Sequence, residues 1–153
     1  MGVLEGLVDY VIGVDTHRDS HTAAAVDAGG TVCEVLTVAS DAFGGRRLLA
    51  FADRHACGRR LWALEGSGSY GANLATFLLE RGEWVAEIDR PKRPARRDGA
   101  KSDELDAVRA AREALARDHL AQPRSRGERE ALRVLLAARE GAVRARTQAV
   151  GLL

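Results

Sequence analysis

The sequence has few cysteines, no long apolar run and no marked excess of charge of either sign. Its two cysteines, Cys33 and Cys57, form no Cys-x-x-Cys pair, which argues against a zinc cage and against a disulfide framework. No run approaches the roughly eighteen apolar residues of a membrane span, and no basic segment followed by an apolar block indicates a signal peptide. We therefore expect a soluble protein of the reducing cytoplasm with no membrane partner.

The charges are balanced over the whole chain but not along it. Lys and Arg number 23 and Asp and Glu number 22, so the total does not indicate a polyanionic partner. Basic residues nevertheless gather between Arg90 and Lys101, where Asp98 is the single acid. The residues that we expect to contact nucleic-acid phosphates are Lys92, Arg93, Arg96, Arg97 and Lys101. The alternative interpretation of this run is a solvated basic loop.

A chain of 153 residues is long enough for one hydrophobic core with an appendage but short for two cores. Apolar runs and alternating patterns predict strands at 11–14, 22–26, 31–38, 61–64 and 84–89. Helical periodicity predicts helices that begin at 40–41, near 70 and at 102–103. We therefore expect an α/β fold with a mixed sheet, whose first three strands are antiparallel, and with helices packed around it.

The predicted helix after residue 102 has two distinguishable sides. Its larger apolar residues share a stripe that we expect to face the core: Leu105, Val108, Ala111 and Leu115. Small residues on the other side would let the helix approach another surface closely: Ala107, Ala110 and Ala114. Trp62 and Trp84 occupy apolar strand positions, so we expect both indoles to pack in the core rather than to stack on bases.

Residues 122–153 form a predicted helical arm that follows an α/β domain at residues 1–121. Gln122 and Pro123 break the preceding helix, and Ser125 with Glu128 three residues later forms a capping-box pattern for the next one. The apolar pattern of the arm is still running at Val150. We therefore expect the chain to be a piece of a longer protein, and the arm to pair with another helix in a homo-oligomer.

Four carboxylates fall where this fold can bring them together. Asp15 ends the first predicted strand, and Glu65 ends the fourth. Asp103 and Asp106 lie one turn apart on a helix and face the same side. Any one of these acids, taken alone, is more commonly a turn residue, a helix cap or a partner of the helix dipole. The four together predict a metal site.

The chemistry of such a cluster favours a divalent metal. Like charges within several ångströms are unfavourable without cations, because each raises the pKa of the others. Mg²⁺ (or Mn²⁺) prefers oxygen ligands. Two such ions about 3.5–4 Å apart can activate a nucleophile and stabilise the leaving oxygen of a phosphodiester. The acidic set therefore suggests phosphodiester chemistry.

Three segments resemble one known family. They are VIGVDTHRDSHT at 11–22, LEGSGSYG at 64–71 and KSDELDA at 101–107. Together they are similar to the N-terminal domain of DEDD-type insertion-sequence transposases, a family that also includes the Piv-type DNA invertases. The similarity covers about residues 10–150, and the segment 101–107 is its most specific part. Asp15, Glu65, Asp103 and Asp106 match the acidic pattern of the family without substitution.

The resemblance implies an RNase H-like (RuvC-like) fold and Mg²⁺-dependent recombination chemistry on DNA, with the four acids as catalytic metal ligands. It also implies a C-terminal domain with a serine nucleophile, for which we find no matching region here. In some members a structured guide RNA takes part. We therefore expect this chain to be the metal-binding part of a transposase, and not to complete strand exchange by itself.

Three alternatives stay open at this level. The first is a non-catalytic nucleic-acid-binding or assembly module, which metal dependence would distinguish. Gly66 to Gly71 form a literal G-x-G-x-x-G as in dinucleotide-binding proteins, although Glu65 would add negative charge beside a pyrophosphate. An actin-like or sugar-kinase phosphate loop would need a glycine in the turn after Asp15, where none occurs.

His17 and His21 are more commonly hydrogen-bonding residues than ligands, so neither is assigned to the metal.

Overall fold

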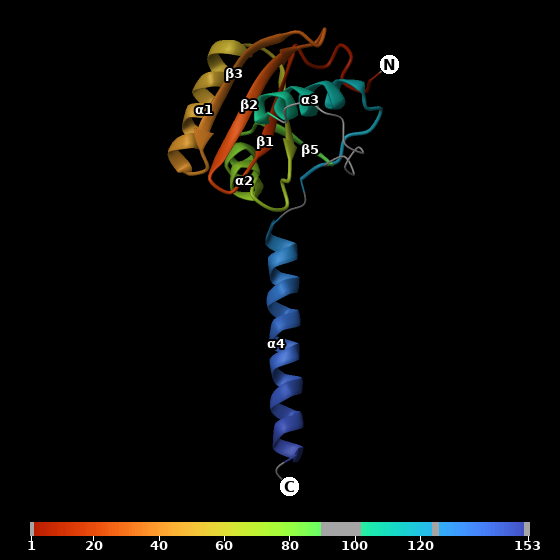
Figure 1. Ribbon diagram of the computed structural model, residues 1–153. Helices are drawn as coiled ribbons and strands as arrows, with labels where there is room; N and C mark the ends of the chain where they lie inside the picture. Colours follow the sequence, from red (N-terminus) through yellow and green to blue (C-terminus); the bar gives the residue numbers. More distant parts are fainter. Residues whose placement is uncertain (1, 90–101, 124–125, 152–153) are drawn as a thin grey trace. The chain divides into compact units, whose positions relative to one another are not determined.

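A computed structural model describes residues 2–89, 102–123 and 126–151, and the chain divides into two compact units, 1–123 and 124–153. The first unit is a five-stranded mixed sheet in the order β3-β2-β1-β4-β5, with helices on both faces (Figure 1). Its strands are β1 Tyr10–Thr16, β2 Ser20–Asp27, β3 Val32–Ala39, β4 Arg60–Glu65 and β5 Trp84–Ile88. Its helices are α1 Ala42–His55, α2 Ala72–Glu80 and α3 Asp103–Ala116. The predicted α/β class is confirmed, and the architecture is that expected of an RNase H-like domain.

The sheet has an antiparallel half and a parallel half. β1 pairs antiparallel with β2, and β2 with β3, as the sequence predicts. The turn between β2 and β3 is held by the Asp27 carboxylate, which accepts hydrogen bonds from the backbone N–H groups of Gly29 and Thr31. β4 pairs in parallel with β1 on one side and with β5 on the other. The carboxyl ends of β1 and β4 therefore lie side by side.

Successive side chains of each strand point to opposite faces of the sheet, so each face has its own core. Ile12 and Val14 of β1 lie in the core beneath α1 and α2, together with Leu48 and Leu78. Val11 lies in the other core, which α3 covers. Residues that belong to the face under α3 are thus the odd-numbered ones of β1.

Helix α3 packs on β1 through small residues, and this corrects the predicted core stripe. Its buried residues are Ala107, Ala110, Ala111 and Ala114. Leu105, predicted to face the core, is 63% exposed, whereas Val108 and Leu115 are partly buried beside the core. The reason is Gly13: a Cβ there would lie 1.9 Å from the carbonyl oxygen of Ala107. So close an approach of helix backbone to strand backbone leaves room only for alanine.

Two further expectations on this unit are wrong in detail. Trp84 is 42% exposed rather than buried, because it opens the edge strand β5, whereas Trp62 is fully buried as predicted. Helix α3 ends at Ala116 and not at Gln122, since the chain turns back toward the edge of β5. There the backbone N–H of Glu87 donates to the carbonyl of Ala121 at 2.8 Å. The segment after α3 therefore covers an edge that would otherwise be unpaired.

The second unit contains the helix α4, Arg126–Gly151, in the region where the arm is predicted. Large apolar side chains on it are exposed: Leu135, Leu136, Val143 and Val150. The proposed capping residue Ser125 lies outside the described residues. Within the described parts of the chain, no helix is both long and apolar enough to cross a membrane.

Candidate metal centre

Asp15 and Glu65 are brought together by the parallel pairing of β1 with β4. The last paired residues are Val14 and Leu64, so the next residue of each strand is one of the two acids. Both belong to the odd-numbered set of their strands, which faces α3. Both are 3% exposed. Sequence position and strand register together therefore bury two carboxylates next to each other under one helix.

The loop after β4 is tied to the end of β1. The Thr16 hydroxyl donates a 2.5 Å hydrogen bond to the carbonyl oxygen of Glu65. Gly66 has a φ of +70°, which glycine adopts without strain, and a Cβ on Gly71 would lie 2.9 Å from the Thr16 methyl group. The glycines thus let this loop pack against the residue that follows Asp15.

Helix α3 presents Asp103 and Asp106 in its first turn. Ser102 caps the helix by accepting a hydrogen bond from the Leu105 N–H at 3.1 Å. Acidic residues at this end also interact favourably with the helix dipole. Because α3 packs tightly over Gly13, its first turn lies over the end of β1. The two helical acids are therefore delivered to the same edge of the sheet as the two strand acids.

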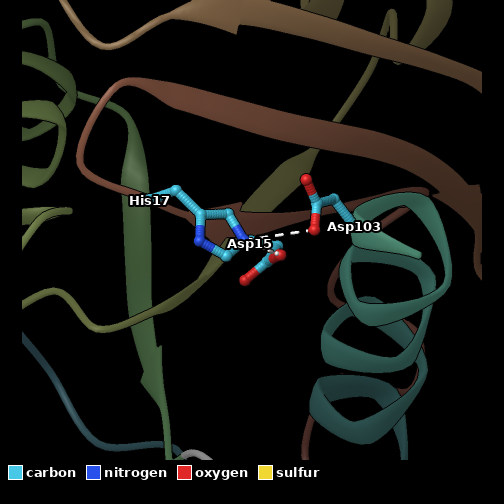
Figure 2. Close-up of side chains that lie close together, drawn as sticks. All are labelled: Asp15, His17 and Asp103. Atoms are coloured by element: carbon cyan, nitrogen blue, oxygen red, sulfur yellow. Dashed lines mark hydrogen bonds and ion pairs between the residues drawn. The ribbon is translucent and has the colours of Figure 1, made fainter. Parts of the chain in front are cut away.

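His17 joins Asp15 to Asp103. Its Nε2 lies 2.8 Å from Asp15 Oδ2 and 3.2 Å from Asp103 Oδ1 (Figure 2). One ligand atom from each of the three residues lies within 4.8 Å of the others, a spacing that suits a bound metal ion. Asp15 is buried, whereas the side chain of Asp103 is half exposed. This trio forms the first half of the centre.

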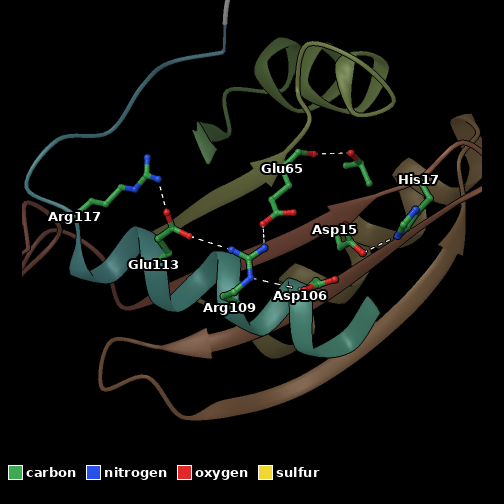
Figure 3. Close-up of polar contacts among 8 residues, drawn as sticks. Asp15, His17, Glu65, Asp106, Arg109, Glu113 and Arg117 are labelled. Atoms are coloured by element: carbon green, nitrogen blue, oxygen red, sulfur yellow. Dashed lines mark hydrogen bonds and ion pairs between the residues drawn. The ribbon is translucent and has the colours of Figure 1, made fainter. Parts of the chain in front are cut away.

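Arg109 joins Glu65 to Asp106 in the second half. Its Nη2 forms an ion pair with Glu65 Oε1, and its Nε lies 3.7 Å from Asp106 Oδ1 (Figure 3). Burial raises the pKa of the Glu65 carboxyl, and the charges of Asp15 and Asp106 add to that rise while Arg109 opposes it. Because Asp15 and Glu65 are buried side by side at the ends of adjacent strands, the two halves belong to one site. Among the described residues, the ligand atoms close enough to share one divalent cation are those of Asp15, His17 and Asp103, and Glu65 and Asp106 lie beside them.

Sequence reasoning found the four acids and missed their two nitrogen-bearing partners. His17 follows the last residue of β1, and its place two residues after Asp15 is the signal that could have indicated it. Arg109 follows Asp106 by three residues, a spacing that makes helical side chains neighbours. His21 was considered with His17, but its strand pairing with Val38 places it among the residues beneath α1. Burial lowers the pKa of His21.

The predicted phosphate-contacting residues lie outside the described residues: Lys92, Arg93, Arg96, Arg97 and Lys101. They belong to the segment 90–101, which lies in the sequence between β5 and the acidic first turn of α3. Their role stays a prediction from the sequence.

Comparison with known families gives one match. A family model described as transposase, of the DEDD type, matches residues 12–153. The matched region includes the strand and helix acids and continues through the arm. A search of curated proteins found no match. The match therefore covers nearly the whole chain, including every side chain of the candidate centre.

Proposed function

Because this chain belongs to the IS110-type DEDD transposase family, we propose that its acidic centre binds Mg²⁺ for phosphodiester cleavage and strand transfer on DNA. The observation that carries the proposal is the placement of Asp15 and Glu65 on one face, at the ends of adjacent parallel strands. Helix α3 brings Asp103 and Asp106 to the same face. This arrangement supports four oxygen ligands around one site.

Each side chain has a distinct part in the proposed centre. Asp15 and Glu65 would be the fixed ligands, since both are buried on a sheet that cannot move independently. Asp103 and Asp106 are more exposed and would complete the coordination from the helix. His17 holds Asp15 and Asp103 together and lies within reach of the same ion. When bound, the metal would activate the attacking oxygen and stabilise the leaving oxygen of a phosphodiester.

DNA is the proposed substrate, and the family match supports DNA binding. The basic run at 90–101 is the proposed phosphate contact, in which case DNA affinity decreases steeply as salt is added. A structured guide RNA is a further proposed partner of the longer protein. A second copy of this chain is the proposed partner of the arm. The serine chemistry of the family is assigned to none of the serines of this chain.

The proposal is tested by calorimetric titration of Mg²⁺ and of Mn²⁺ into the wild type and into Asp15→Asn. We expect saturable binding by the wild type, weakened by Asp15→Asn by at least about tenfold, since a buried charged ligand is lost. The variant keeps the size of the side chain, so the fold should be preserved.

Glu104→Gln is the matched control, because Glu104 is an exposed acid of the same helix turn, and no hydrogen bond or ion pair among the described residues joins it to the site. Its binding should stay within about twofold of the wild type. If the wild type binds neither ion, this chain does not hold the catalytic metal by itself, and the alternative of a non-catalytic nucleic-acid-binding or assembly module gains support.

A further inference from the structure

Arg109 lies inside the acidic centre rather than at its edge. Besides its contacts with Glu65 and Asp106, its Nη1 donates to Glu113 Oε2 at 3.2 Å (Figure 3). One guanidinium is therefore shared among three carboxylates, two of which are proposed metal ligands. Its side chain is 34% exposed, whereas that of Glu65 is 4% exposed. The positive charge thus reaches a nearly buried acid from the solvent side.

This position conflicts with a metal ion bound to the same oxygens. Arg109 occupies the Oε1 oxygen of Glu65, so Mg²⁺, which binds carboxylate oxygen at about 2.0–2.1 Å, can bind that oxygen only by replacing the guanidinium. Two cations at one buried carboxylate also repel each other strongly in a medium of low dielectric constant. An ion that coordinates Glu65 must therefore displace the guanidinium or be weakened by it.

Glu113 provides a place for the displaced side chain. It lies one helical turn after Arg109, and it also pairs with Arg117, which lies 3.7 Å from Asp89. Arg109 can leave Glu65 while its Nη1 stays on Glu113. The Nη2 and Nε donors would then have no carboxylate partner. A planar guanidinium with free donors is suited to bind a phosphate in a bidentate manner.

We propose that Arg109 competes with the divalent metal for Glu65 and Asp106, and that metal binding turns its freed donors toward a DNA phosphate. This inference rests on the proposed function, because it needs the acidic centre to bind metal. Metal and DNA then strengthen each other's binding, since the ion releases the cation that the phosphate uses. Arg109 is in this sense a positioning residue that couples two ligands.

The first test is calorimetric titration of Mg²⁺ at about pH 8 into the wild type, Arg109→Gln, Arg109→Lys and Arg112→Gln. Arg112 is an exposed cation of the same helix that donates to the Gly30 carbonyl, so its variant removes an equal charge away from the site. We expect Arg109→Gln to lower the Kd for Mg²⁺ by about tenfold or more. Arg109→Lys should restore a Kd near that of the wild type, and Arg112→Gln should leave it within about twofold.

The outcomes separate this inference from the function on which it rests. Binding that is unchanged or weaker in Arg109→Gln, with normal binding by the wild type, overturns the competition and leaves the metal site intact. Binding by Arg109→Gln but not by the wild type supports the competition, and it shows that the wild-type chain does not hold the metal by itself. Absence of binding in both proteins overturns both. Circular dichroism of each variant shows whether it is folded. If Arg109→Gln is not folded, Arg109→Met, which also removes the charge but keeps an apolar stem, takes its place with the same expected decrease in Kd.

The second test addresses the phosphate. The probe is a short duplex DNA oligonucleotide, and its affinity is measured against salt concentration with Ca²⁺ or with a chelator. With Ca²⁺, the slope of log affinity against log salt should be smaller in Arg109→Gln than in the wild type by about one. With the chelator, the two slopes should agree. Equal slopes under both conditions would show that Arg109 does not reach the phosphate.

Discussion

At the scale of single residues, partly buried charged side chains contact several polar partners at once rather than a single one. Glu83 shows this away from the metal centre. It accepts from Arg60 Nε at 2.9 Å and from the Trp62 indole N–H at 2.8 Å. The hydrogen bond from Arg60 is the main reason that the pKa of Glu83 is lowered. This group fixes the start of β4, whose far end carries Glu65.

Glu83→Gln should lower the free energy of unfolding by about 1–3 kcal/mol at neutral pH, since Arg60 loses its charged partner. Because the folded-state pKa of Glu83 lies below its unfolded value, the contribution is complete above about pH 4.5 and is lost as the pH falls through the folded-state pKa. Urea unfolding at several pH values should show the variant and the wild type converging in acid. Glu80→Gln, at an exposed helical position, should change stability by at most about 0.5 kcal/mol. A constant difference across pH would contradict this account.

At the scale of elements, the distance between α3 and β1 determines whether the acids meet. Sequence periodicity predicted α3 and the core positions of Ala111, Val108 and Leu115, but it wrongly placed Leu105 in the core, because hydrophobicity alone favours leucine over the alanines that pack there. The deciding contact is between backbones: a Cβ on Gly13 would also lie 2.6 Å from the Ala111 nitrogen. No local pattern in either segment specifies a partner that lies about ninety residues away in the chain.

Gly13→Ala should therefore force α3 away from the sheet. We expect the free energy of unfolding to fall by about 1–3 kcal/mol, the usual cost of overpacking. The same shift would move Asp103 and Asp106 away from Asp15, so Mg²⁺ binding should weaken in the calorimetric titration. Gly141→Ala is the control, since a Cβ there meets nothing within 4 Å; Mg²⁺ binding should stay as in the wild type, and α4 should gain about 0.5–1 kcal/mol of stability rather than lose any. Normal metal binding by a folded Gly13→Ala protein would show that the spacing is not critical.

At the scale of the whole molecule, the α/β unit and the arm differ in how far their apolar side chains are buried. The α/β unit has two cores, whereas α4 leaves Leu136, Val143 and Val150 exposed at intervals of seven residues. A single helix gains most of its stability by burying an apolar face, and a seven-residue repeat suits a partner helix. This repeat is the observation that supports the proposed association of two copies through the arm.

Val143→Lys should weaken self-association by at least about tenfold. In the proposed pair of helices, each copy would lose a valine that the partner covers and would gain a charge in its place. Sedimentation equilibrium of the wild type and the variant measures the effect. Gln148→Lys adds the same charge at an exposed polar position of the same helix and should leave association within about twofold. A wild type that is monomeric at every concentration would exclude this role for the arm.

The sequence by itself determined the order of strands and helices, and it predicted the helical arm and the four acids of the proposed site. These properties follow from local periodicity and from short motifs, which act over a few residues. Tertiary structure decided which partners those acids have. Parallel register set Asp15 beside Glu65, and the approach of α3 to Gly13 brought His17 to Asp103 and Arg109 to Glu65. Such contacts depend on the packing of distant backbones, which no short stretch of sequence encodes.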